Sequence, residues 1–215
     1  MQKLSKSQRE SLQRAVTTYH SNLAGSPAEE FLNSRSLDPS LLEKFRFGYV
    51  EEPLPGHEMH QGKLAIPYLR RHPRHGWTCV SIRFRALDNE TKPKYASLAG
   101  DRPRIYNTLA LTEPVLDVGI AEGELDAVSA TLAGLPTVGI PGASSWQSYW
   151  RELFLGYRTV YVFTDGDEPG EALGRRIGKD LPNAKVIHCP SGEDVNSIYA
   201  NHGAEELQKY WKEHQ

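Results

Sequence analysis

Four short apolar runs alternate with helical patterns in the second half of this chain, and this alternation limits the folds that the chain can adopt. Strands that alternate with helices form a mostly parallel sheet with helices on both faces. In such a sheet, ligands bind beyond the carboxyl ends of the strands, so we expect the chemistry there. The predicted strands cover residues 115–121, 137–140, 158–163 and 184–189, and the predicted helices cover 123–133, 144–155, 168–181 and the stretches from 194 and 204.

The first half of the chain has a different character, and the change falls near Glu113 and Pro114. Residues 77–86 alternate between polar and apolar side chains, which predicts a half-buried strand with one polar, basic face. We therefore expect two domains, a mixed α+β domain over residues 1–112 and an α/β domain over 113–215. The other elements predicted in the first half are helices over residues 5–23, 28–34 and 39–45 and a strand over 63–68.

The composition excludes several classes of protein. The net charge is −2, so any contact with nucleic acid must come from a local basic patch. Cys79 and Cys189 lie far apart and have no metal-ligand spacing, which predicts two reduced, buried thiols and no zinc site. No apolar run approaches the length of a membrane span, and the polar N-terminus does not resemble a signal peptide. We therefore expect a cytoplasmic protein with no membrane partner.

Acidic residues follow three of the predicted strands at the point where each strand ends. Glu122 follows the first strand, Asp165 and Asp167 follow the third, and Glu193 and Asp194 follow the fourth. Because the carboxyl ends of parallel strands meet at one edge of a sheet, these carboxylates should converge. Several unneutralised carboxylates at one site repel each other, so the pattern predicts a hard divalent cation, Mg²⁺ or Mn²⁺.

Each acidic residue also has an ordinary structural explanation. Glu122 fits the positive end of a helix, with Asp126 on a solvated helical face. The run from Asp165 to Asp167 fits a turn that caps a helix, and Asp194 fits an N-cap. The acidity of all three strand ends together is what favours the metal site.

A basic cluster lies in the first half of the chain, within 22 residues of sequence, and tyrosines are interleaved with it. This pattern indicates a local surface that binds phosphates, with a solvated loop as the alternative. Four histidines nearby could suggest a second metal site, but the surrounding proline and arginine residues favour a surface loop. The cluster consists of Arg83, Arg85, Lys92, Lys94, Arg102 and Arg104 with Tyr95 and Tyr106, and the histidines are His57, His60, His72 and His75.

Two of these motifs resemble a known family. The sequence EGELDA at 122–127 resembles the EGxxDA motif of Toprim domains, and DGDEPG at 165–170 resembles their DxDxxG motif. The first half resembles the polymerase core of bacterial-type, single-chain replicative primases. The residues that carry this second resemblance are FLNSRSL at 31–37, FRFGY at 45–49, AIP at 65–67, SIRFRAL at 81–87, KPKY at 92–95 and PSGEDVN at 190–196.

The resemblance implies a DNA primase core that synthesises short RNA primers on single-stranded DNA from ribonucleoside triphosphates. It implies that Glu122, Asp165 and Asp167 hold the metal, and that Asp126, Asp194 and Asn196 complete or flank the site. It also implies a cleft between the two subdomains that binds nucleotide phosphates and the template. The residues expected to face this cleft are Arg83, Arg85, Lys92, Lys94, Tyr95 and Arg104.

The chain departs from complete replicative primases in three ways. It has no cysteine pattern for the N-terminal zinc ribbon, and it ends within one helix after the last acidic loop. We therefore expect either a fragment or a minimal gene of the phage or plasmid type, with a helicase or a zinc-ribbon protein on another chain. Asn196 also stands where the family commonly has an acidic residue. A Toprim nuclease and a non-catalytic module that binds nucleic acid or the replisome remain as alternatives.

Overall fold

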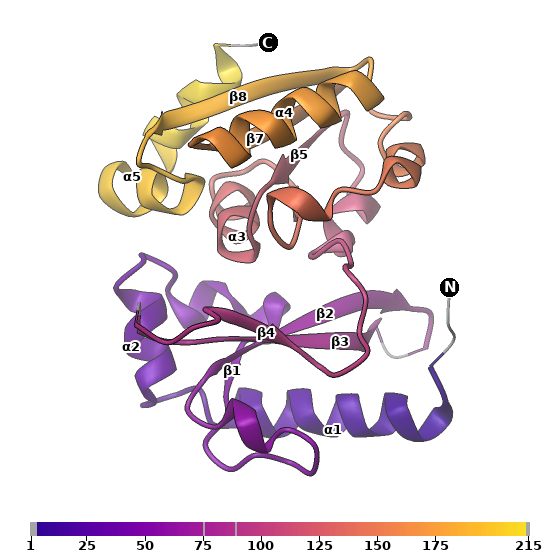
Figure 1. Ribbon diagram of the computed structural model, residues 1–215, viewed down its shortest axis with the longest axis vertical. Coiled ribbons are helices and arrows are strands. Elements are labelled where there is room, and N and C mark those ends of the chain that lie inside the picture. Colours follow the sequence, from indigo (N-terminus) through magenta and orange to yellow (C-terminus); the bar gives the residue numbers. More distant parts are fainter. Residues whose placement is uncertain (1–3, 75, 89, 214–215) are drawn as a thin grey trace. The chain divides into compact units, whose positions relative to one another are not determined.

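The computed structural model describes residues 4–74, 76–88 and 90–213, and the chain divides into two compact units, Met1–Arg102 and Pro103–Gln215 (Figure 1). The sequence analysis placed the division ten residues later, at 112/113. Ile105 and Ala110 belong to the hydrophobic core of the second unit, so the segment 103–112 packs with the second half of the chain.

The first unit is built on a four-stranded antiparallel sheet in the order β1-β2-β3-β4, with helices α1 (Lys6–Ser21) and α2 (Pro27–Asn33). The long hairpin of β2 and β3 is the centre of this sheet, and its tip extends past the short strands on either side. The strands are β1 (Gly48–Tyr49), β2 (Leu64–His72), β3 (Gly76–Arg85) and β4 (Tyr95–Ser97).

Two predictions for the first unit were wrong. The helix expected over residues 39–45 is instead two short 3-10 helices, Pro39–Leu41 and Glu43–Phe45, because the backbone of Leu42 leaves the helical region (φ −102°, ψ 4°). The strand expected over residues 63–68 continues to His72, into a segment that was expected to be loop and hairpin connection.

Two of the histidines expected at the surface are core residues. His57 and His60 are 6% and 2% exposed. The Tyr19 hydroxyl and Nδ1 of His57 are hydrogen-bonded at 2.8 Å, and the His60 ring stacks on Phe84 with ring centroids 3.9 Å apart. Aromatic packing against the sheet therefore overrides the polar character of this segment, and His75 lies outside the described residues.

The second unit has a parallel four-stranded sheet in the order β6-β5-β7-β8, which confirms the predicted α/β fold. Val118, Ile120 and Val162 belong to the core cluster that also includes Leu173 and Ile177 of α4. On β7 the alternate residue Phe163 packs on Trp211 of α5 with ring centroids 6.1 Å apart, so helices cover both faces (Figure 1). The elements are β5 (Asp117–Ala121), α3 (Glu124–Leu132), β6 (Thr137–Gly139), β7 (Thr159–Gly166), α4 (Glu168–Asp180), β8 (Ala184–Ser191) and α5 (Val195–Lys212).

The predicted helix over 144–155 was also wrong, because this segment forms two 3-10 helices, Ala143–Ser145 and Ser148–Leu153. Large aromatic side chains hold it in place. Trp146 is fully buried, and its Nε1 donates to Oδ2 of Asp180 at 2.8 Å. The two helices predicted at the C-terminus are confirmed: both lie within α5, and the non-helical backbone of Gly203 (φ 84°, ψ 176°) separates them. The described helices lack the length and apolarity needed to cross a lipid bilayer.

Candidate active site: the acidic edge of the parallel sheet

Glu122 directly follows β5, at the carboxyl edge of the parallel sheet. Its Oε2 atom is buried and has no hydrogen-bond partner among the described residues. Burial raises the pKa of Glu122 above its usual value, and the nearby carboxylates of Asp167 and Asp126 raise it further. The backbone amides of Asp165 and Ala143 act in the opposite direction. Glu122 is therefore a carboxylate whose charge the protein alone does not fully compensate.

Asp165 and Asp167 lie where β7 passes into α4. Asp167 is the N-cap of α4, and its Oδ1 accepts a hydrogen bond from the Gly170 amide at 2.8 Å. A Cβ atom at Gly170 would lie 2.4 Å from the backbone oxygen of Asp165, so only glycine fits there. This contact explains the glycine of the second motif, which holds the start of α4 close to the end of β7.

Asp126 connects α3 to the start of α5. Its Oδ1 accepts a hydrogen bond from the backbone amide of Asn196 at 2.9 Å. The Asn196 side chain in turn donates to Oγ of Ser129 at 2.9 Å, and Asn196 is only 1% exposed. Asn196 is thus committed to a contact between helices. Sequence reasoning missed Ser129, although its position one helical turn after Asp126 places both residues on the same face of α3.

Asp194 begins α5 as its N-cap, and its Oδ1 accepts a hydrogen bond from the Ser197 amide at 2.6 Å. The charges that act on Cys189, near the end of β8, indicate that the acidic loops converge. Burial raises the pKa of the Cys189 thiol, and the charges of Asp126, Asp165, Asp194 and Glu193 raise it further. The carboxylates that follow β7 and β8 therefore lie in one neighbourhood with the first residues of α3, as the strand order predicts.

The residues at this edge fit a divalent cation bound mainly through water. Among the described residues, no group of three His, Cys, Asp or Glu side chains is placed to enclose a metal ion. Mg²⁺ does not need an enclosing cage, because it usually keeps several waters and takes one or two carboxylates plus substrate phosphates. The buried, unpartnered Oε2 of Glu122 is a hard oxygen donor of the kind that such an ion prefers.

The expected basic face of β3 is largely closed. Arg85 is 1% exposed, its Nε donates to the Tyr95 hydroxyl at 3.1 Å, and its guanidinium lies 4.2 Å from the centre of the Phe31 ring. The Arg85 side chain is therefore buried against partners inside the first unit, and its contact with phosphate stays a prediction.

The other basic residues occupy different positions. The Arg83 guanidinium lies 4.7 Å from the centre of the half-buried Tyr95 ring, and Lys92 and Lys94 are exposed on the segment that leads into β4. Arg104 is half-buried and belongs to the second unit. The phosphate contacts expected of Arg83, Lys92, Lys94 and Tyr95 stay predictions.

A family model described as Toprim-like matches residues 119–199, which contain both acidic motifs. The chain is 52% identical over 149 residues to the Gene 57 protein of Mycobacterium phage D29, covering 69% of this chain and 97% of that protein. It is 23% identical over 244 aligned positions to the DNA primase of Haemophilus influenzae, covering 94% of this chain and 41% of that protein. The chain therefore contains a Toprim-like domain over residues 119–199 and belongs to the same family as the phage Gene 57 protein.

The fold of the chain is also similar to those of solved structures. It resembles the structure of a DnaG primase catalytic domain bound to single-stranded DNA, with a TM-score of 0.74 and 18% sequence identity. The match covers 95% of this chain and 80% of that one, so both units of the chain take part in it. The chain spans only about two fifths of the length of the bacterial primase that it matches.

Proposed function

We propose that this protein is the polymerising core of a DNA primase, which makes short RNA primers on single-stranded DNA from ribonucleoside triphosphates. The observation that carries the proposal is the buried, unpartnered oxygen of Glu122 beside Asp167 and Asp126. Such a cluster is electrostatically unfavourable without a cation, and a cation at this edge suits phosphoryl transfer. The similarity to primase cores across both units supports nucleotides as the substrate.

The acidic residues have distinct roles in this proposal. Glu122, Asp165 and Asp167, with Asp194 beside them, would hold Mg²⁺ or Mn²⁺. When bound, the metal would neutralise the charge of the triphosphate. Asp126 positions the loop that carries Asp194, through its hydrogen bond to the first turn of α5.

The basic residues would recognise phosphate. Lys92 and Lys94 are exposed point charges suited to the triphosphate or the template backbone, and Arg83 and Arg104 are further candidates. Tyr95 presents a ring that Arg83 and Arg85 hold in place.

The partners are proposed on the same basis. The related catalytic domain bound to single-stranded DNA supports a DNA template. A helicase or a zinc-ribbon protein on another chain would help to select the start site. The 52% identity to a phage protein supports action in the cytoplasm of a bacterial host.

Primer synthesis is the direct test. The protein is incubated with single-stranded DNA, labelled ribonucleoside triphosphates and Mg²⁺ or Mn²⁺, and the products are resolved by size. We expect labelled oligoribonucleotides that disappear in Glu122→Gln, which removes the negative charge but keeps the shape of the side chain. Shortening of the DNA without synthesis would indicate a Toprim nuclease instead.

The control variant is Glu171→Gln. Glu171 is exposed in the first turn of α4 and pairs with Arg175 at 3.2 Å, so it carries the same charge near the acidic edge but already has a cationic partner. We expect it to retain full synthesis. If Glu122→Gln also retained full synthesis or full biological activity, a non-catalytic binding role would replace the proposal.

A further inference from the structure

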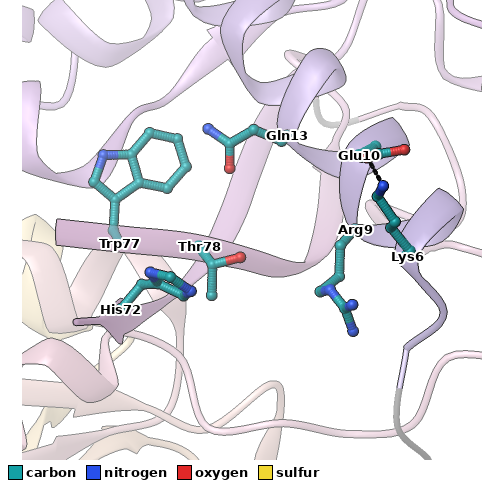
Figure 2. A pocket seen from close by; sticks show the side chains of 7 residues that line it. All are labelled: Lys6, Arg9, Glu10, Gln13, His72, Trp77 and Thr78. Carbon is teal, nitrogen blue, oxygen red and sulfur yellow. Dashed lines mark ion pairs between the residues drawn. The ribbon is translucent and has the colours of Figure 1, made fainter. Parts of the chain in front are cut away.

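A groove in the first unit takes no part in the proposed chemistry. It has a volume of about 530 Å³ and lies between α1 and the tip of the β2–β3 hairpin (Figure 2). Helix α1 contributes Lys6, Arg9 and Gln13 to its lining, and the hairpin contributes His72, Trp77 and Thr78. All of these residues belong to the first unit, so the groove is formed within one compact body.

Trp77 is the most unusual residue of this groove. The other three tryptophans of the chain are core residues, with exposures of 0% (Trp146), 7% (Trp150) and 6% (Trp211). Trp77 is half-buried, and it lines the groove. The Arg46 guanidinium lies 5.5 Å from the centre of its ring, a distance at which a cation and an aromatic face attract each other.

The described lining residues of the groove carry a net positive charge, because two cations stand against one carboxylate. Lys6 and Arg9 are exposed on α1, and Figure 2 shows them at the end of the groove away from the indole. Glu10 is the one carboxylate among the described lining residues, and its Oε1 lies 3.8 Å from Nζ of Lys6. Such an exposed ion pair is weak and is readily exchanged for a contact with phosphate.

The hairpin adds a further cation on the same side as the indole. Arg71 is the direct partner of Trp77 in the antiparallel register of β2 and β3. Side chains of directly opposed residues lie on the same face of the two strands. An aromatic ring is therefore flanked by Arg46 and Arg71, with further cations along the groove.

We propose that this groove binds single-stranded DNA, with one base stacked on Trp77 and the adjoining phosphates held by Arg9 and Lys6. Proteins that bind single strands without sequence preference combine a basic groove with an aromatic ring, because every base has a face that can stack. The groove offers both, and its volume suits a nucleotide unit. The inference rests on the proposed function only in taking the strand to be the template.

The experiment measures binding without catalysis. The full chain is titrated with a fluorescein-labelled oligothymidylate in EDTA and without nucleotides, and affinity is read from fluorescence anisotropy. Unlabelled oligothymidylate should quench the tryptophan emission of the wild type, because Trp77 alone of the four indoles lines the groove. We expect Trp77→Ala to bind roughly tenfold more weakly.

Two further variants keep the test informative if Trp77→Ala folds poorly. Trp77→Phe retains a ring, so it should keep most of the affinity while losing the quenching. Arg9→Gln changes an exposed position on α1, and it should reduce the slope of log affinity against log salt by roughly 0.7, the value for one phosphate contact to a single strand. Arg175→Gln, an exposed arginine on α4, is the matched control and should bind like the wild type.

Unchanged affinity in both Trp77→Ala and Arg9→Gln would overturn the inference, as would an equal loss in Arg175→Gln. Because the assay contains no metal or nucleotide, it is independent of the proposed polymerase activity. Intact binding without any primer synthesis would therefore contradict the proposed function and leave this groove supported.

Discussion

Two charged side chains that are shielded from solvent, one in each unit, differ in whether their hydrogen-bonding atoms have partners. Arg85 in the first unit is almost completely buried, and its guanidinium donates to the Tyr95 hydroxyl and to the Ala86 carbonyl at 3.1 and 3.0 Å. Glu122 in the second unit is half-buried, and its Oε2 has no hydrogen-bond partner in the described part of the chain.

This difference distinguishes a charge that supports the fold from a charge that is expected to bind a ligand. A buried charge whose hydrogen bonds are satisfied stabilises one arrangement of its neighbours. A buried charge without a partner costs free energy, and that cost is recovered when a ligand binds. Arg85 is therefore expected to matter for folding, and Glu122 is expected to matter for metal binding and catalysis.

The largest expected effect is on activity, at Asp167. Asp167→Asn should reduce primer synthesis by roughly 10²–10³-fold, an effect of about 3–4 kcal/mol on the barrier. It should leave the stability of α4 almost unchanged, because asparagine caps helices about as well as aspartate. Primer synthesis and the midpoint of urea unfolding are measured on the same preparation.

Asp167→Ala is the companion variant, since it removes both the charge and the cap. It should lose about 1 kcal/mol of stability in addition to the activity. Full activity in Asp167→Asn would show that Asp167 only caps α4. The carboxylate of Asp167 in the second unit would then support the fold, as Arg85 does in the first unit, and would not act in catalysis.

The second effect is on stability, at Arg85. Arg85→Met should lower the free energy of unfolding by about 3 kcal/mol, because the Tyr95 hydroxyl and the Ala86 carbonyl would lose their donor inside the core. Urea unfolding followed by circular dichroism measures this loss. Lys94→Met, an exposed change nearby, should alter stability by less than about 0.5 kcal/mol. Equal stability of the two variants would show that burial of Arg85 contributes nothing.

The sequence predicted the parallel sheet well, because the sheet depends on local patterns, and it identified the acidic residues at the carboxyl edge as a candidate site. The strand–helix alternation and the acidic residue after each strand can be read from adjacent positions. Convergence then follows from topology alone, as the shared electrostatic effect of Asp126, Asp165 and Asp194 on Cys189 indicates.

The sequence predicted the first unit less well, because its features depend on contacts between distant segments. Arg85 alternates with Phe84 as on an exposed strand face, but Phe31, more than fifty residues earlier, covers it. His57 and His60 lie in a polar stretch, and only their packing against Tyr19 and Phe84 makes them core residues. No local pattern of polar and apolar residues encodes such contacts between distant segments.

The third effect concerns stability in acid and depends on His60. Burial lowers the pKa of His60 from its usual value of 6.5 to about 4, with smaller contributions from Lys63 and His57. Between these two pH values the unfolded chain binds a proton that the folded chain excludes. The contribution of His60 is therefore complete above about pH 6.5 and is lost as the pH falls towards 4.

Lowering the pH from 7 to 5 should thus cost roughly 1–2 kcal/mol at His60. His60→Phe, which keeps a ring that can stack on Phe84, should remove this part of the pH dependence. The measurement is urea unfolding at several pH values. An unchanged pH profile in the variant would show that a buried histidine of the first unit carries no such cost.

The smallest expected effect, and the sharpest test of the contrast, is the stability of Glu122→Gln without metal. The pKa of Glu122 is raised, so its contribution to stability is complete below the unfolded pKa and is lost as the pH rises through the folded value. At pH 7 the amide removes the unfavourable charge and should raise the melting temperature by roughly 2–4 °C, which corresponds to about 1 kcal/mol.

Added Mg²⁺ should stabilise the wild type and leave Glu122→Gln unchanged, because the variant has lost the charged oxygen that the ion would contact. Melting curves with EDTA and with Mg²⁺ measure both responses. A variant that is less stable than the wild type in EDTA would show that the protein alone already compensates the charge of Glu122. Arg85 and Glu122 would then differ only in how deeply their side chains are buried.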